Sequence, residues 1–216
     1  MTTHVRDGAS AEDLCAGCEA VDAALQADAA TAHLAPPWRA FAERAESAAR
    51  EEVLLGRRRR RARARIAVAD ARWDAEVDAF GAVLLGVSGG SVGAPPYGHY
   101  FERTSIAEAK GAGAERALEI AGPWLDDLEK AAPAPLSTTW RPRLQPVVAA
   151  LSAAVAEDRS VARAERAAAA ALAPLRDEID QALGGLLEEL GRLFPDAPER
   201  PAAYVAQSLL MRCDEG

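Results

Sequence analysis

Two long stretches of this chain repeat small and apolar residues at alternating spacings of four and three, and this repeat constrains the fold more than any other feature. Such spacing places one residue per turn in a single stripe along an α-helix, as in helices that pack lengthwise. The first stripe follows Phe41, Ala45, Ala48, Glu52, Leu55, Arg59, Ala62, Ile66, Ala69, Trp73, Glu76, Phe80 and Val83. The second follows Val147, Leu151, Ala154, Asp158, Val161, Glu165, Ala168, Leu172, Leu175, Ile179, Ala182, Leu186 and Leu190.

The composition favours helices with thin cores. Alanine supplies 52 of the 216 residues, and only 5% are aromatic. Alanine is the best helix former and has little side chain to bury. Because β-branched and aromatic residues rarely alternate, no sheet is predicted. We therefore predict an all-α fold, an elongated helical bundle with two long heptad-patterned helices, a shorter connecting helix and an N-terminal helix.

The helix boundaries follow from capping residues, glycine and proline. The N-terminal helix is expected over residues 10–33, with Ser10 as its cap and Asp13 three residues on. "APPW" at 35–38 ends it, and the first long helix is expected over 38–85. The connecting helix is expected over 105–130. The last helix should run from Pro142 or Pro146 to Leu190.

The segments between these helices are rich in glycine and proline. Residues 86–101 are predicted to form a loop, and residues 131–142, "AAPAPLSTTWRP", a linker. Pro174 should kink or divide the last helix. The predicted organisation is a helical segment at 1–34, a long-helix bundle domain at 38–192 and a C-terminal tail at 193–216 with a short helix.

The strongest local charge feature is an arginine run in the first long helix. Between residues 57 and 65 only two positions are not arginine, within a chain whose net charge is −8. Residues 39–65 carry ten arginines and four glutamates, so that this segment has a net charge of +6 and the rest of the chain −14. An asymmetry of this size predicts an acidic counterpart, inside the protein or outside it. The candidate binding residues are Arg57, Arg58, Arg59, Arg60, Arg61, Arg63 and Arg65.

The run has several interpretations, which the residues leave open. The arginines can be solvated or paired within the protein, for example by an antiparallel last helix that places Glu165 opposite Arg59. They can bind an acidic protein surface or an anionic lipid. They can also neutralise nucleic-acid phosphates, which would make binding strongly dependent on salt. Whether the long helices pair in parallel or antiparallel, and within one chain or between chains, is not determined by the pattern.

A glycine–serine motif lies at the end of the first long helix. "GVSGG" at 86–90 has the Gly-x-Ser-x-Gly pattern of a nucleophile elbow. Over a dozen residues "AVLLGVSGGSVGA" is similar to the serine motif of patatin-like acyl hydrolases, and this resemblance implies Ser88 as a nucleophile. That family has a glycine-rich oxyanion loop before the serine and an Asp-Gly pair after it. Here the preceding stretch is rich in arginine, and Asp7-Gly8 lies near the N-terminus.

The cysteines and histidines indicate no metal site. "CAGC" at 15–18 places Cys15 and Cys18 on one helix face, where free cysteine is ordinary core. A structural zinc would need Cys213 and either His33 or His4 to join them. A redox role would need a βαβ setting, which the pattern lacks. We expect no metal, no cofactor and no catalytic residue.

The densest aromatic cluster, "YGHYF", lies at the end of the predicted glycine–proline loop. Tyr97, His99, Tyr100 and Phe101 either fold back onto the bundle or form an exposed contact patch. We predict a non-enzymatic helical interaction or scaffold protein that binds another protein or itself through its long helices. A nucleic-acid-associated protein is the alternative, and a serine hydrolase the second alternative. The absence of a leader pattern and of an 18-residue apolar run predicts a cytoplasmic protein without a membrane span.

Overall fold

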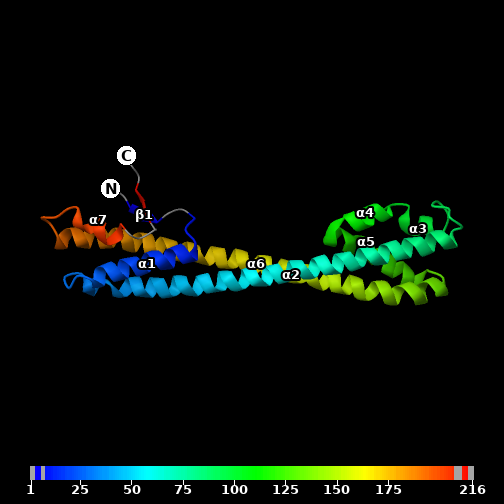
Figure 1. Cartoon of the computed structure of the whole chain (residues 1–216), viewed down its shortest axis with the longest axis horizontal. Helices are drawn as coiled ribbons and strands as arrows, with labels where there is room; N and C mark the ends of the chain where they lie inside the picture. The colour runs from blue at the N-terminus through cyan, green and yellow to red at the C-terminus, as the bar shows by residue number, and fades with distance from the viewer. Residues whose placement is uncertain (1–2, 6–7, 207–210, 214–216) are drawn as a thin grey trace. The chain divides into compact units, whose positions relative to one another are not determined.

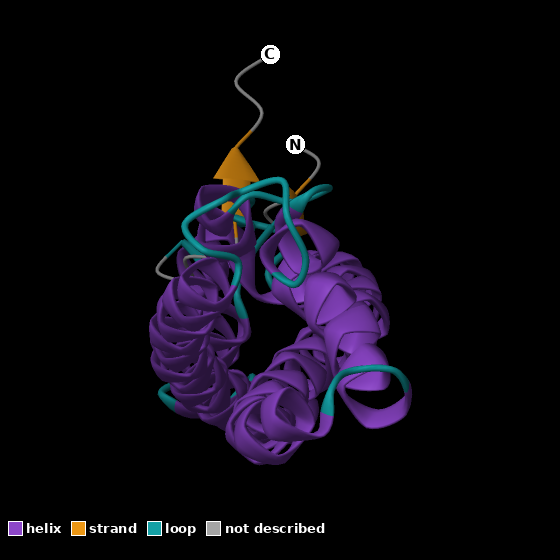
Figure 2. Cartoon of the chain, turned by 90° about the vertical axis from the view of Figure 1, so that its right-hand side faces the viewer, coloured by secondary structure: helices purple, strands orange, loops and turns teal. Residues whose placement is uncertain are grey.

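The computed structural model describes residues 3–5, 8–206 and 211–213, and most of them lie in helices (Figures 1 and 2). The predicted all-α helical bundle is confirmed, with an N-terminal helix and two long helices that pack together. A small two-stranded antiparallel sheet, which the sequence did not indicate, pairs the two ends of the chain. In chain order the elements are β1 (Thr3–Val5), α1 (Ala11–Gln26), the 3₁₀ helix η1 (Ala32–Leu34), α2 (Pro36–Val87), α3 (Tyr97–Phe101), α4 (Ile106–Gly111), α5 (Gly113–Lys130), α6 (Ala134–Leu193), α7 (Arg200–Val205) and β2 (Met211–Cys213).

The chain divides into two compact units. Unit 1 consists of Met1–Gly56 and Arg163–Gly216, and unit 2 consists of Arg57–Ala162. The long helices α2 and α6 each contribute residues to both units. Each unit has its own hydrophobic core.

The start of α1 agrees with the sequence prediction, but its end does not. Ser10 accepts a hydrogen bond from the backbone N–H of Asp13, whose side chain accepts one from the N–H of Ser10, so that a capping box closes the helix start. The helix stops at Gln26 rather than at residue 33. Thr31 explains this end, because its buried hydroxyl donates to the carbonyl of Leu25 at 2.9 Å and so satisfies a carbonyl of the last turn.

Both long helices extend further than the prolines suggested. α2 begins at Pro36, because a proline in the first turn lacks only an N–H that would have no helical partner. α6 begins at Ala134, so the predicted linker at 131–142 is wrong beyond its first residues. Pro174 does not divide α6, which continues to Leu193. Leu172 and Leu175 on either side of this proline are buried in the unit 1 core, and their packing supports the helix there.

Unit 1 packs α1, α7 and its parts of α2 and α6 around one core. Leu14, Val21 and Leu25 from α1 are fully buried together with Ile179 and Leu190 from α6. The predicted short C-terminal helix is present as α7, which contacts α1.

A polar cluster at the end of α1 helps to hold α7 in place. Asp28 accepts hydrogen bonds at 2.8 Å from both Arg200 and Tyr204, and its pKa is lowered, first by a bond from the N–H of Ala30.

Unit 2 is built around an aromatic cluster centred on Phe80 of α2. Its ring lies 5.0 Å from the rings of Tyr100 and Trp140, measured between centroids, and 5.7 Å from that of Trp124. These partners come from α3, α6 and α5, so that one side chain joins four helices. Trp73, one heptad before Phe80, is also fully buried, and its indole N–H donates to the carbonyl of Ala109 at 3.0 Å.

The predicted stripes largely match the buried faces. Every position of the α6 stripe is buried or half-buried. On α2 the stripe holds as far as Phe80 with the exception of Glu52, which is exposed, but Val83 is 45% exposed whereas Val77 and Leu84 are fully buried. A straight helix drifts relative to a seven-residue repeat, and α5 and α3 cover the adjacent side of α2 in this unit.

This shift in the buried face predicts opposite outcomes for two substitutions on one helix. Phe80→Ala should lower the free energy of unfolding by about 3–5 kcal/mol, because it leaves a cavity among four aromatic partners. Val83→Ala, three residues away, should change it by less than about 0.5 kcal/mol, since it lies on the exposed face. Urea denaturation followed by circular dichroism measures both. Similar losses for the two variants would contradict the observed packing.

Candidate binding surfaces

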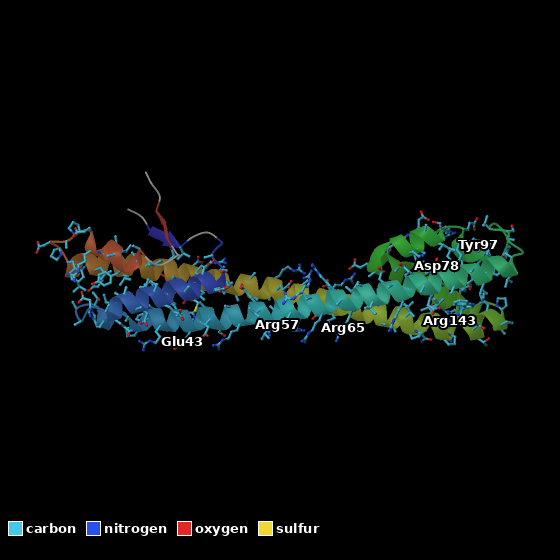
Figure 3. All side chains as sticks on the ribbon, in the orientation of Figure 1. Glu43, Arg57, Arg65, Asp78, Tyr97 and Arg143 are labelled. Carbon is cyan, nitrogen blue, oxygen red and sulfur yellow. The ribbon has the colours of Figure 1, made fainter. Side chains whose placement is uncertain are left out.

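The arginine run lies at the start of unit 2, within the uninterrupted helix α2 (Figure 3, which labels Arg57 and Arg65). Helical residues turn by about 100° each, so consecutive arginines project in different directions around the axis. Seven guanidinium groups therefore cannot all reach one neighbouring helix.

Two of the seven arginines pair with α6. Arg59 Nε lies 3.0 Å from Asp158 Oδ1, and these side chains are only 24% and 23% exposed. Arg65 pairs with Glu157, the residue before Asp158. Further along α2, Glu76 pairs with Arg143 at 2.8 Å. As residue numbers rise on α2 they fall on α6, so the two helices are antiparallel in unit 2.

The antiparallel register considered from the sequence placed Glu165 opposite Arg59. Within unit 2, Arg59 pairs with Asp158, which belongs to the same stripe of α6. A seven-residue repeat is self-similar, so the stripes alone do not fix the register.

Five arginines of the run remain without an internal counterpart. Arg57, Arg58, Arg60, Arg61 and Arg63 are all exposed, and none has an ion pair with any residue in the described part of the chain. The helix carries them as fixed positive charges. Such a surface can bind carboxylates or phosphates, with arginine able to form two parallel hydrogen bonds to either.

The two units differ in charge. Unit 1 has ten lysines and arginines against twenty aspartates and glutamates, a net charge of −10. Unit 2 has fifteen against thirteen, a net charge of +2. Without residues 57–65 unit 2 would also be acidic, so the run alone reverses its sign.

The aromatic segment is a short helix, α3, and the prediction of a loop is wrong for Tyr97–Phe101. Tyr100 and Phe101 are buried, at 5% and 6% exposure, and belong to the unit 2 core. Tyr97 is half-buried, and its ring lies 5.0 Å from that of Phe101. Of the four predicted contact residues, His99 is the exposed one.

Asp127 of α5 holds α3 against the bundle. It accepts a hydrogen bond from the hydroxyl of Tyr100, and its other oxygen lies 3.1 Å from His99 Nε2. Burial and then this carboxylate raise the pKa of Tyr100. The tyrosine therefore stays protonated and keeps its donor role. A cavity of about 580 Å³ adjoins this cluster, and side chains of both charges line it, including Arg103, Arg116 and Glu119.

Ser88 forms hydrogen bonds that hold the backbone of the following loop. Its hydroxyl donates to the carbonyl of Ala94 at 3.1 Å and accepts from the backbone N–H of Tyr97 at 3.0 Å. Both bonds close the loop between α2 and α3. The strand–turn–helix setting of a nucleophile elbow is absent here, since Ser88 directly follows the long helix α2.

The "CAGC" motif lies on α1. Cys18 is fully buried in the unit 1 core and Cys15 is half-buried. Burial, followed by the charges of Cys15 and Glu19, raises the pKa of Cys18 to about 12. The side chain of Cys213, which the hypothetical zinc set would require, lies outside the described residues, as does that of His4, one of the two alternative histidines. Within the described part, no group of three or more metal-ligating side chains occurs.

Comparison of the chain with protein-family models, curated proteins and solved structures finds no match. Among the helices at residues 8–206, none is long and apolar enough to cross a membrane.

Two residues near the run are missing from the sequence prediction. Val68 and Arg72 continue a row that begins with Arg58, Arg61 and Arg65, and both are exposed. The signal was present as a second stripe, at spacings of three and four, beside the buried one. This second stripe is hard to recognise in the sequence, because five consecutive arginines place a charge on every side of the helix.

The half-buried and exposed ion pairs should differ in their contributions to stability. Asp158→Ala should lower the free energy of unfolding by about 1–2 kcal/mol, because it removes the carboxylate that lies 3.0 Å from the partly buried guanidinium of Arg59. Glu157→Ala should cost less than about 1 kcal/mol, since the Arg65 side chain is 66% exposed. Double-mutant cycles with Arg59→Ala and Arg65→Ala, read by urea denaturation, measure each coupling. A larger coupling for the Arg65 pair would contradict the observed burial.

The position of Cys18 predicts slow thiol chemistry. At mildly alkaline pH its raised pKa leaves little thiolate, so iodoacetamide should modify Cys18 only on unfolding and Cys15 sooner. Mass spectrometry of peptides from native and urea-unfolded samples separates the two sites. Fast modification of Cys18 in the native protein would show that α1 is not packed as described.

Proposed function

We propose that this is a non-enzymatic helical interaction protein that binds an acidic partner protein through the arginine run of α2. The observation that carries this proposal is a set of five exposed arginines that form no ion pair with any residue the structure describes: Arg57, Arg58, Arg60, Arg61 and Arg63. Exposed like charges repel one another, and an acidic counterpart relieves that repulsion. A cytoplasmic location and the absence of catalysis are part of the same proposal.

The helical scaffold supports this role because it holds the charges on a regular element. Ion pairs of Arg59 with Asp158 and of Glu76 with Arg143 join α2 to α6, and Ala62, Ala69 and Trp73 are buried, so the helix that carries the run is fixed on its inner side. A surface ordered before binding loses less conformational entropy when a partner arrives. Because these heptad faces already cover each other, self-association would have to use the outer surfaces of the long helices.

Nucleic-acid binding is the second candidate, and one observation favours it. Arg60 and Arg63 project from a side of α2 away from Arg58 and Arg61, and charges spread around a helix suit a phosphate backbone that wraps a groove. Glu157 and Asp158 weigh against it, because they neutralise two arginines of the run and would lie close to any phosphate bound there.

Affinity purification can separate these two candidates. The full chain, immobilised and treated with nuclease, should retain acidic proteins from a cell extract, and retention should fall as salt rises. A variant with Arg57, Arg58, Arg60, Arg61 and Arg63 changed to alanine should lose them, while its helicity stays that of the wild type.

Loss of all retention after nuclease treatment of the wild type would instead support nucleic-acid binding. Equal retention by wild type and the five-arginine variant would show that the run is not the binding surface.

A further inference from the structure

A shallow groove runs between α2 and α6 of unit 2, next to the arginine run. It has a volume of about 430 Å³. Alanines form most of its lining, and Val68, 56% exposed, stands at its edge. The lining residues are Ala64, Arg65, Val68, Ala69 and Arg72 on α2, with Ala150, Ala153, Ala154 and Glu157 on α6.

The alanines determine what can fit this groove. Alanine side chains leave the two helix backbones close to the surface, so a third helix can approach both and insert its larger side chains between them. An exposed valine beside exposed alanines gains from contact with an apolar partner surface. Nucleic acid offers no such surface along its phosphate backbone, whereas an amphipathic helix does.

A row of arginines runs along one side of α2; its later members line one edge of the groove, and the earlier ones continue the row beyond it. We call this row with Val68 the arginine rim. It consists of Arg58, Arg61, Arg65, Val68 and Arg72, at spacings of three and four on one side of α2. Arg58, Arg61 and Arg72 are exposed and have no ion pair with any described residue. At about 1.5 Å per residue the rim extends along about 21 Å, or four helical turns.

Glu157 is the one acid that lines the groove, and it already pairs with Arg65. The groove therefore combines an apolar floor with a surplus of positive charge along one edge. A partner complementary to it has apolar residues on one face and carboxylates beside that face. An acidic amphipathic helix meets both requirements.

We propose that this groove binds an acidic amphipathic helix of a partner protein, with the apolar face on the alanines and carboxylates on the arginine rim. The proposal rests on the proposed function and deepens it by naming the structural class of the partner and the site where it binds. The five arginines without ion pairs then divide into two sets. Arg58 and Arg61, with Arg57 one turn before Arg61, lie on the side of the partner helix, whereas Arg60 and Arg63 point away from it.

The test uses designed peptides as probes. The first is a fluorescein-labelled three-heptad helix with leucine and alanine on one face and glutamate along both sides of it. The second has the same composition, with leucines and glutamates spread evenly around the helix. A labelled DNA duplex is the third probe. Fluorescence anisotropy at about 0.05 M and about 0.3 M salt measures binding to the full-length protein.

Two pairs of matched variants locate the site. The rim variant carries Arg61→Ala and Arg72→Ala, and its control carries Arg60→Ala and Arg63→Ala on another side of α2, with the same change in charge. The groove variant carries Ala150→Gln and Ala153→Gln, and its control carries Ser152→Gln and Ala156→Gln on another side of α6. All of these positions are exposed, and glutamine is a good helix former, so thermal melting by circular dichroism should be unchanged.

We expect the amphipathic peptide to bind about tenfold more tightly than its rearranged counterpart. The rim and groove variants should each weaken it about tenfold, and the two controls less than about threefold. If the rim variant and its arginine control lose the same amount of affinity and the groove variant loses none, the groove is not the binding site of the helix. That result would leave the acidic partner of the proposed function intact.

Two other outcomes would also overturn the proposal. The protein could bind DNA and not the peptide, with both arginine variants weakening DNA binding equally. This result would contradict both the helix-binding groove and the proposed acidic protein partner. A wild-type dimer by sedimentation equilibrium that the groove variant converts to monomer would identify the occupant as a second copy of this chain.

Discussion

The antiparallel packing of α2 against α6 through small side chains underlies the rest of unit 2. Ala62, Ala69 and Ala154 lie in this contact and are almost completely buried. Alanine brings the backbones close but removes little apolar surface from water, so this stretch gains limited stability from burial alone. The half-buried pair of Arg59 with Asp158 and the cluster around Phe80 add fixed contacts at either end. The pair also fixes the register, which a repeating alanine seam leaves undefined.

The same thin packing accounts for the exposed charge of the arginine run. In unit 2, Glu157 and Asp158 lie on the facing stretch of α6 and form ion pairs with Arg65 and Arg59 respectively. A third helix over the run would supply further acids, but α4 and α5 pack near Trp73 and Phe80 instead. Five arginines are therefore left to solvent beside a groove lined by alanine. The charge and the groove arise from one cause, a two-helix stretch with small side chains.

Part of the candidate surface could be predicted from the sequence. The run itself, its helical setting and the charge asymmetry are local properties, and residues 57–65 do lie within one helix. Which arginines are paired could not be predicted, because the pairing depends on a register that a heptad repeat fits in several ways. The aromatic segment shows the opposite case. Its residues suggested a loop, either folded back onto the bundle or exposed, but they form α3. Gly98 allows the preceding loop to approach this helix closely, since a Cβ there would lie 2.9 Å from the Gly93 carbonyl oxygen.

The sequence by itself determined that the chain is helical, where α1 begins and which faces of the long helices are buried. These properties follow from alanine content, from the capping box of Ser10 and Asp13, and from spacing, all of which act between residues close along the chain. The tertiary structure decided where helices end, whether Pro135 and Pro174 interrupt α6, and how α2 and α6 are aligned. Those outcomes depend on contacts between distant residues. Leu172 and Leu175 keep a proline-containing helix packed against a core, and Arg59 pairs with Asp158, which is 99 residues away in the sequence.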